Sequence, residues 1–236
     1  MIKKLSNLIK AIIRGKFIFF NKINLTKEWM GNNYGGFYIH PDVLNSNSIV
    51  FSFGVGEDIS FDSALIKKYN LNVYAFDPTP KSIDFIMKQM PIKNFSFYPF
   101  GISKESEKKT FYLPKNSNHI SGSLHQTDIV DHNNSLNLDF KSLKDILKDI
   151  QIKHIDILKM DIEGSEYDVI DSILSLDIVI KQILIEFHPQ MFENGRKLTR
   201  NSFKNLEYKG FTCFAVSETF SEFSFINLNY LDLENS

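Results

Sequence analysis

Short apolar runs alternate with amphipathic segments along most of the chain. Seven of these runs are rich in β-branched and aromatic residues and have the length of buried strands. They span residues 48–53, 71–76, 95–100, 155–160, 181–187, 211–216 and 223–228. Between the first three runs, residues 58–69 and 80–90 carry apolar positions about one helical turn apart. Strands that alternate with helices predict a Rossmann-like α/β fold, with a mainly parallel seven-stranded sheet and helices on both faces.

The connections between the predicted elements add three details. Residues 217–222 separate the last two strands and are too few for a helical crossover, so the last strand should run antiparallel. Asp58 stands where the first helix would need an N-cap. The stretch 103–137 is long and polar, and we interpret it as a lid that contains a short strand at 110–114 and turn residues elsewhere.

The N-terminal segment, residues 1–30, is expected to be helical and separate from a main domain at residues 31–236. Lys10, Arg14 and Lys16 interrupt its apolar stretch, so it is neither a signal peptide nor a membrane span. We favour a helix that packs on its own domain or on a second copy in a homodimer. The alternative is a helix that rests on an anionic membrane surface. The apolar positions at helical spacing are Leu5, Leu8, Ile9, Ile12 and Ile13.

The charge and cysteine content of the chain narrow its partners and location. The 236 residues carry a formal net charge of −1, which provides no concentrated basic surface for a phosphate backbone. We therefore expect no nucleic-acid partner. Cys213 is the single cysteine, lies in an apolar run and cannot form an internal disulfide. These features predict a reducing, cytoplasmic location.

The first predicted strand leads into a glycine-rich turn, SFGVGEDISFD, at residues 52–62. Gly54 and Gly56 would let a ligand approach the backbone at the start of the following helix. A dinucleotide fingerprint needs a third glycine where this chain has Ile59, and the two acidic residues after Gly56 would repel a pyrophosphate. The turn therefore favours a cationic cofactor without phosphate groups.

The second predicted strand ends at Asp77, about 20 residues beyond the glycine turn. An acid at this place accepts hydrogen bonds from both ribose hydroxyls of a bound nucleoside. Together with the glycine turn, Asp77 indicates S-adenosylmethionine as the cofactor. An NAD-dependent sugar-nucleotide oxidoreductase would share the sheet and is the alternative function.

Polar residues also follow the fourth and fifth predicted strands: Asp161, Glu163, Glu166, Glu186 and His188. Because the carboxyl ends of parallel strands meet at one edge, Asp161, Glu186 and His188 should face the same crevice. One interpretation makes His188 the general base, oriented by Glu186 or Asp161. A second gives these three residues a shared divalent cation, Mg²⁺ or Mn²⁺. A third makes His188 a strand-end cap, and Glu166 is equally well explained as a charge at a helix N-terminus.

The lid contributes three further histidines, His119, His125 and His132. Their spacings of six and seven residues match no recognised metal-binding pattern. We expect them to be solvated or to face the substrate.

Four segments of the chain, SFGVGEDISFD, AFDPTP, LKMDIEGSE and ILIEFHP, together resemble the FkbM-type methyltransferases. The resemblance covers roughly residues 34 to 230, and LKMDIEGSE is its most specific part. It implies a class I S-adenosylmethionine-dependent enzyme that O-methylates sugar hydroxyls of bacterial surface glycans or of their nucleotide-sugar precursors. Ser52 and Asp58 depart from the usual residues of the family, so a non-catalytic scaffold with this fold is a further alternative.

The resemblance also implies which residues contact the cofactor. Gly54 and Gly56 would line its methionine and ribose parts, and Asp77 would hold the ribose diol. Residues 34–36 would cover the pocket from one side, and the small residues at 121–124 would close it from another. The implied contacts are Phe53, Gly54, Gly56, Asp58, Asp77, Pro78, Thr79, Gly101, Ile102, Ser103 and Asp161.

Overall fold

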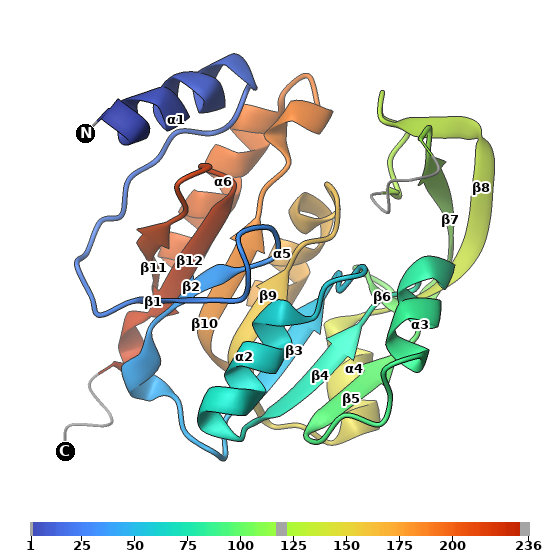
Figure 1. Ribbon diagram of the computed structural model, residues 1–236, viewed down its shortest axis with the longest axis horizontal. Coiled ribbons are helices and arrows are strands. Elements are labelled where there is room, and N and C mark those ends of the chain that lie inside the picture. Colours follow the sequence, from blue (N-terminus) through green and yellow to red (C-terminus); the bar gives the residue numbers. More distant parts are fainter. Residues whose placement is uncertain (1, 117–121, 232–236) are drawn as a thin grey trace.

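A twisted seven-stranded sheet forms the centre of the computed structural model, which describes residues 2–116 and 122–231, with side chains from Leu5 onward (Figure 1). The strand order is β11-β12-β10-β9-β3-β4-β5. Each of the seven predicted runs forms one strand, so the predicted sheet is confirmed. The strands are β3 (Ile49–Phe53), β4 (Asn72–Phe76), β5 (Phe95–Tyr98), β9 (His154–Met160), β10 (Val179–Glu186), β11 (Phe211–Val216) and β12 (Glu222–Asn227).

The directions of the strands also agree with the prediction. Strands β5, β4, β3, β9 and β10 pair in parallel, whereas β12 is antiparallel to both β10 and β11. The last strand of the chain therefore inserts between β10 and β11 instead of lying at the edge of the sheet. The parallel strands all end at the upper edge of the sheet in Figure 1, so the residues that follow them gather there.

Helices cover both faces of this sheet, as predicted, and neighbouring strand residues alternate between two cores. Phe51 and Leu158 point into the core that contains α4, α5 and α6, whereas Val50 and Ile157 point into the core that contains α2 and α3. The helices are α2 (Ser60–Tyr69), α3 (Pro80–Met87), α4 (Leu143–Ile150), α5 (Glu166–Leu174) and α6 (Gly195–Tyr208).

A short hairpin precedes the sheet and was not predicted from the sequence. It pairs β1 (Glu28–Met30) with β2 (Phe37–Ile39) in antiparallel fashion, and Phe37 and Ile39 are buried in the α2 and α3 core. Strands of three residues are too short to show a periodic pattern. Three single-turn 3₁₀ helices complete the fold: η1 (Pro41–Val43), η2 (Pro189–Met191) and η3 (Leu228–Tyr230).

The predicted lid is more regular than its sequence indicated. A second sheet with the order β6-β8-β7 consists of β6 (Gly101–Ile102), β7 (Glu107–Pro114) and β8 (Val130–Lys141). The expectation of turn residues from 130 to 137 was wrong. Residues 131–135 of β8 are polar and carry no apolar alternation, whereas Leu136, Leu138 and Phe140 alternate with polar residues in its second half, for example with Asn137, which pairs with Thr110 on β7. His119 and Ser121 lie outside the described residues.

The N-terminal helix α1 (Ile2–Ile13) forms as predicted, but its apolar side faces outward. Leu5, Ile9, Ile12 and Ile13 are 59%, 49%, 53% and 79% exposed, and Ala11 on the opposite side is buried. Packing of the apolar side on the chain's own domain, one part of the favoured interpretation, was therefore wrong. In the described parts of the chain, every helix is too short or too polar to cross a bilayer.

Candidate functional site

The candidate site lies where β3, β4, β9 and β10 end side by side. Phe53 is in register with Phe76 on β4 and with Met160 on β9, so the residues that follow these three positions lie at the same level. This arrangement brings the glycine turn, Asp77 and Asp161 together at one edge of the sheet. The sheet topology thus gathers motifs that are far apart in the sequence.

Position 54 requires glycine because the ends of β3 and β9 approach each other closely there. Its φ is +76°, and a Cβ atom at this position would lie 1.6 Å from the carbonyl oxygen of Asp161. Backbone hydrogen bonds from Gly54 to Phe76 and from Asp161 to Phe53 hold the three strand ends together. Gly56 also has a positive φ, of 59°. The two glycines are therefore needed for the backbone conformation of the turn, and not only to let a ligand approach it.

Asp77 is buried and anchors the glycine turn. Its Oδ2 accepts a hydrogen bond from the Gly56 amide at 2.9 Å. Its Oδ1 accepts from the amide of Thr79 at 2.9 Å and from the Thr79 hydroxyl at 2.6 Å. The Thr79 hydroxyl is also 2.7 Å from the buried hydroxyl of Ser82. The carboxylate is thus held in one orientation at the carboxyl end of β4.

Asp58 does not cap α2 as predicted, because Ile59 occupies the N-cap position. Its Oδ1 accepts from the amide of Ser60 at 2.8 Å, and its Oδ2 accepts from the Asn32 side chain at 2.7 Å. Asn32 in turn accepts hydrogen bonds from the amides of Tyr34 and Gly35. Asp58 therefore ties the β1–β2 loop to the start of α2, a role that the sequence did not reveal.

A pocket of about 410 Å³ opens between these elements. Ser103 is not among the residues that line it, because its hydroxyl is turned to the carbonyl of Glu105. All the other cofactor contacts implied by the sequence do line it: Phe53, Gly54, Gly56, Asp58, Asp77, Pro78, Thr79, Gly101, Ile102 and Asp161.

Two buried charged residues in this pocket were missed by sequence reasoning. Lys159 is only 5% exposed and donates a hydrogen bond to the carbonyl of Gly54 at 2.9 Å. Asp62 is 2% exposed, and among the described residues its Oδ1 has no hydrogen-bond partner. Burial raises the pKa of Asp62, although Lys159 opposes this. Both residues lie within patterns typical of a strand and a helix, where a single charged residue gives no signal of its own.

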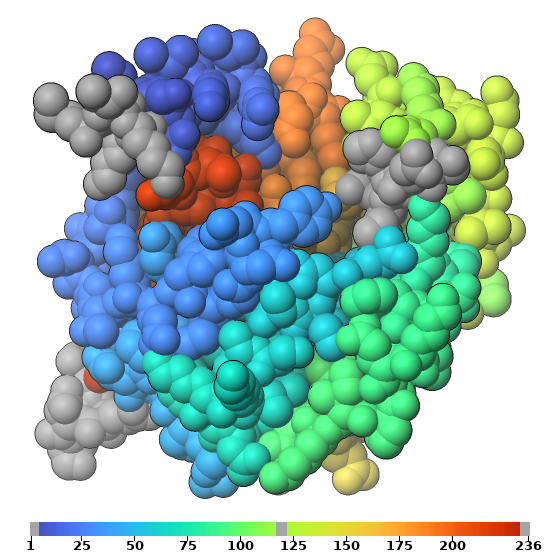
Figure 2. All heavy atoms as spheres, in the orientation of Figure 1, coloured from blue at the N-terminus to red at the C-terminus, as the bar shows by residue number. Residues whose placement is uncertain are grey.

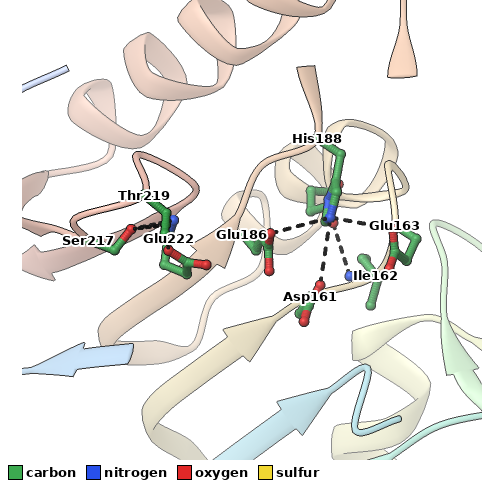
Figure 3. Close-up of polar contacts among 9 residues, drawn as sticks. Asp161, Ile162, Glu163, Glu186, His188, Ser217, Thr219 and Glu222 are labelled. Atoms are coloured by element: carbon green, nitrogen blue, oxygen red, sulfur yellow. Dashed lines mark hydrogen bonds and ion pairs between the residues drawn. The ribbon is translucent and has the colours of Figure 1, made fainter. Parts of the chain in front are cut away.

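The second constellation is centred on His188, which follows β10 and is 5% exposed (Figure 3). Its Nε2 lies 3.4 Å from Glu163 Oε2, 3.7 Å from Glu186 Oε1 and 3.9 Å from Asp161 Oδ1. The ligand atoms of Asp161, Glu186 and His188 all lie within 4.8 Å of one another. The structure thus brings together the three residues that the sequence predicted, and adds Glu163. We call these four residues the acidic–histidine cluster.

Glu166 holds the imidazole of His188 from the other side. Its side chain is completely buried, and its Oε1 lies 3.1 Å from His188 Nδ1 and accepts from the Ile162 amide at 3.0 Å. Glu166 is also the first residue of α5, where its charge suits the helix N-terminus. Its contact with the imidazole, which sequence reasoning did not foresee, orients His188 so that Nε2 faces the cluster.

The charges around His188 determine its protonation. Burial alone would lower the pKa of His188, but the carboxylates of Glu166, Glu163 and Glu186 outweigh it and raise the pKa to about 10. Burial and the neighbouring Asp161 raise the pKa of Glu186 to about 8. Without another cation in the cluster, His188 is therefore protonated at neutral pH. The surrounding carboxylates stabilise the imidazolium.

A second, wider pocket of about 910 Å³ adjoins the first. Tyr34, Asp161 and Glu163 line both pockets, whereas Glu186 and His188 line only the second. The acidic–histidine cluster consequently lies at the junction of the two pockets. The predicted cover at residues 34–36 is present in part, since Tyr34 and Gly35 line the first pocket.

The remaining lid histidines make their contacts outside this cluster. His125 contacts Asp168 on α5 at 3.0 Å and packs edge-on against Phe192. His132 lies 3.2 Å from the carbonyl of Thr127, within the lid. His125 therefore helps to dock the lid on the main domain.

Residues 19–222 match the family model described as Methyltransferase FkbM domain. The chain belongs to this family. Membership makes the protein an S-adenosylmethionine-dependent methyltransferase and confirms the resemblance carried by the four sequence motifs. No curated protein sequence gives a significant match.

Several solved structures are similar to this chain at low sequence identity. A fibrillarin/Nop5p complex is 10% identical, with a TM-score of 0.47 over 77% of this chain and 72% of the other. Aeropyrum pernix fibrillarin with bound S-adenosyl-L-methionine is 9% identical, with a TM-score of 0.45 over 89% and 86%. An rRNA methylase from Streptococcus thermophilus is 15% identical, with a TM-score of 0.40 over 78% and 87%. The family assignment rests on the sequence match alone.

Proposed function

We propose that this FkbM methyltransferase O-methylates a hydroxyl group of a carbohydrate. The observation that supports this most is the position of the acidic–histidine cluster between the glycine-lined pocket and the wider second pocket. Bound S-adenosylmethionine supplies an electrophilic methyl group, and its transfer forms an oxygen–methyl bond, breaks the sulfur–methyl bond and leaves S-adenosylhomocysteine. The residues of the chain must bind the acceptor, align its oxygen and help to remove its proton.

The first pocket suits a cofactor that combines a nucleoside with positive charge. Asp77 presents a rigid carboxylate at the end of β4, where it can accept hydrogen bonds from a ribose diol. Asp62 has a buried carboxylate oxygen without a partner among the described residues, which suits a donor such as an ammonium group. Ile102 and Phe76 provide apolar wall for a base. These features fit S-adenosylmethionine and disfavour a pyrophosphate, so they also weigh against the oxidoreductase alternative.

The second pocket suits a large polar acceptor. Its volume of about 910 Å³ exceeds that of the first pocket, and amide and hydroxyl side chains such as Asn33, Gln190 and Thr219 line it. Tyr34, which is 77% exposed, stands at the boundary of both pockets and offers an aromatic face to a sugar ring. We therefore favour a saccharide of a bacterial surface glycan, or its nucleotide-sugar precursor, as the acceptor. The single buried cysteine, Cys213, supports a reducing cytoplasmic location.

The protonated state of His188 limits what it can do alone. An imidazolium cannot accept the proton of the acceptor hydroxyl, so the simple general-base role is disfavoured unless another cation displaces that proton. The cluster instead offers the carboxylate of Asp161 beside the acceptor pocket, whereas the raised pKa of Glu186 leaves that group largely protonated at neutral pH. Activation of the hydroxyl at this cluster remains the role that its position supports best.

The proposal is tested by binding and by transfer. Titration with S-adenosylhomocysteine and with NAD should show binding of the first compound only. Transfer from methyl-labelled S-adenosylmethionine to a panel of oligosaccharides and nucleotide sugars should yield a product stable to base, as expected of an ether and not of an ester. Label in a base-labile product would contradict O-methylation of a hydroxyl. Binding without transfer to any saccharide would favour the non-catalytic scaffold.

A further inference from the structure

We propose that Asp161, Glu186 and His188 bind a divalent metal ion of the Mn²⁺ class at the junction of the two pockets. The inference rests on the proposed function, because an ion in this position would bind the acceptor oxygen and lower the pKa of its hydroxyl. The proton would then pass to water or to a free carboxylate as the oxygen–methyl bond forms. Binding of the ion can nevertheless be measured without any methyl transfer.

The spacing of the three donors suits one ion. Ligands about 2.1 Å from a six-coordinate ion are about 3 Å apart when adjacent and about 4.2 Å apart when opposite. His188 Nε2 lies 3.7 Å from Glu186 Oε1 and 3.9 Å from Asp161 Oδ1. Side-chain movements of about 1 Å would therefore complete the coordination. Glu163 Oε2, 3.4 Å from the same nitrogen, is a fourth candidate ligand.

The orientation of His188 is an independent observation that points to a metal ion. Metal-binding histidines commonly donate their second ring N–H to a carboxylate, which fixes the tautomer and directs the free nitrogen at the ion. Glu166 accepts from Nδ1 in this way and is completely buried. Nε2 lies within 3.9 Å of carboxylate oxygens of Asp161, Glu163 and Glu186, and His188 is only 5% exposed (Figure 3). A solvent-exposed acidic patch would not need a buried histidine whose ring is oriented by a further carboxylate.

The donor set also favours one class of ion. Carboxylates suit Mg²⁺ and Mn²⁺, whereas an imidazole nitrogen is a poor ligand for Mg²⁺. A site with two carboxylates and one imidazole therefore favours Mn²⁺ or a related transition ion. Asp161 and Glu186 stand at the ends of β9 and β10, which are paired in register, so the two carboxylates sit on a rigid base.

Mn²⁺ binding to the purified full-length protein is measured by the loss of the free-ion paramagnetic resonance signal, without cofactor or acceptor. Glu186→Gln and Asp161→Asn remove one ligand charge each with little change of shape. We expect each to weaken Mn²⁺ binding by at least about tenfold. The matched control is Glu222→Gln, which removes a charge near Glu186 but outside the donor set. It should change the affinity by less than about threefold.

Absence of Mn²⁺ binding by the wild-type protein at millimolar concentrations would overturn the proposal. Equal weakening by Glu222→Gln would overturn it as well, because the effect would then be general electrostatic attraction. Titration of S-adenosylhomocysteine into the same variants keeps the two proposals distinct. If the wild-type protein does not bind S-adenosylhomocysteine, the proposed function is refuted. The Mn²⁺ titration would still decide whether the metal site exists.

We also infer that α1 docks on an anionic membrane surface, an inference carried by a different observation. The helix turns its polar side toward the protein, where Asn7 and Arg14 line the second pocket. Its apolar side, defined by Leu5, Ile9, Ile12 and Ile13, points away from the protein. Figure 2 shows α1 at the upper margin of the molecule. This orientation is the reverse of a helix that packs on its own domain.

The charge of the N-terminal segment indicates which kind of surface covers the apolar side of α1. Residues 1–27 contain seven Lys or Arg and no Asp or Glu. A symmetric contact between two copies of α1 would bring these basic segments together, which is unfavourable. An anionic bilayer instead accepts the apolar side chains, and its surface potential acts on the net positive charge of the whole segment, including Lys10, Arg14 and Lys16 beside the second pocket. Because α1 also forms a wall of the second pocket, docking would place that pocket close to the membrane surface.

Co-sedimentation with vesicles tests this inference. The wild-type protein should bind vesicles of equal parts phosphatidylcholine and phosphatidylglycerol, and bind pure phosphatidylcholine at least about tenfold more weakly. Ile9→Glu should abolish binding, whereas the control Met87→Glu, at an exposed apolar position on α3, should not. Failure to bind the anionic vesicles would overturn the inference. So would a stable dimer in light scattering that Ile9→Glu converts to monomers, because the apolar face would then belong to a protein interface.

Discussion

Replacement of Asp77 by Asn tests the cofactor site most directly. Both carboxylate oxygens accept from backbone amides, Oδ2 from Gly56 and Oδ1 from Thr79. Whichever way the Asn amide is turned, its NH₂ group meets one of these N–H donors. One buried donor is therefore left without an acceptor, at a cost of about 1–3 kcal/mol. For a chain of this length we expect a melting temperature lower by about 2–10 °C.

Asp77→Asn should weaken cofactor binding by more than its loss of stability can explain. Hydrogen bonds from a ribose diol to a charged acceptor contribute about 1.5–3 kcal/mol, so S-adenosylhomocysteine should bind about 10- to 150-fold more weakly. Isothermal titration on the folded variant measures this directly. Circular dichroism at the temperature of the titration establishes that the variant in the calorimeter is folded.

Ser82→Ala serves as the matched control for Asp77→Asn. Ser82 is fully buried and contacts the Thr79 hydroxyl, so the variant loosens the same turn without removing the charge of Asp77. It should lower the melting temperature but keep the affinity for S-adenosylhomocysteine within about twofold. Wild-type affinity in folded Asp77→Asn would refute the assignment of Asp77 to the ribose. Equal weakening by Ser82→Ala would attribute the effect to the turn.

Three further predictions concern other parts of the molecule. Gly54→Ala should lower stability by more than about 4 kcal/mol, because its Cβ would collide with the carbonyl of Asp161; a wild-type thermal unfolding curve would contradict this. His188→Ala should keep its affinity for S-adenosylhomocysteine but methylate about a hundredfold more slowly or worse, and a chelator should inhibit the wild type until Mn²⁺ is added. A fully active variant would remove His188 from the chemistry. Burial raises the pKa of Cys213 to about 12, so a thiol reagent at pH 8 should react only after denaturation; rapid reaction of the native protein would show that β11 opens.

Local patterns in the sequence were sufficient for the main sheet and for Gly54 and Asp77 in the first pocket. The seven strands were predictable because each of them is a short run made up mainly of apolar residues. The positions of Gly54 and Asp77 were predictable because each directly follows such a run. Their convergence followed from the rule that parallel strands end at one edge. The same rule predicted that Asp161, Glu186 and His188 would meet, which the structure shows.

The tertiary structure alone decided the features that depend on partners far away in the sequence. The extent of strand β8 is decided by its pairing with β7, since residues 131–135 are polar and give no strand pattern of their own. The contact between Glu166 and His188 spans 22 positions, and neither residue carries a local sign of it. That contact, with the other carboxylates around the imidazole, is why His188 is protonated and unsuited to act alone as a base.

Helix α1 likewise has one property that the sequence determines and another that only the tertiary structure determines. The spacing of its apolar residues determined that a helix forms, because periodicity is a property of the segment itself. Which side of that helix faces the protein depends on the surface it meets, and here the polar side lines the second pocket while the apolar side stays exposed. The sequence by itself thus determined the seven strands of the main sheet and the edge at which their motifs gather. Only the folded chain determined which charges become neighbours there, because burial and electrostatic coupling depend on distances in space.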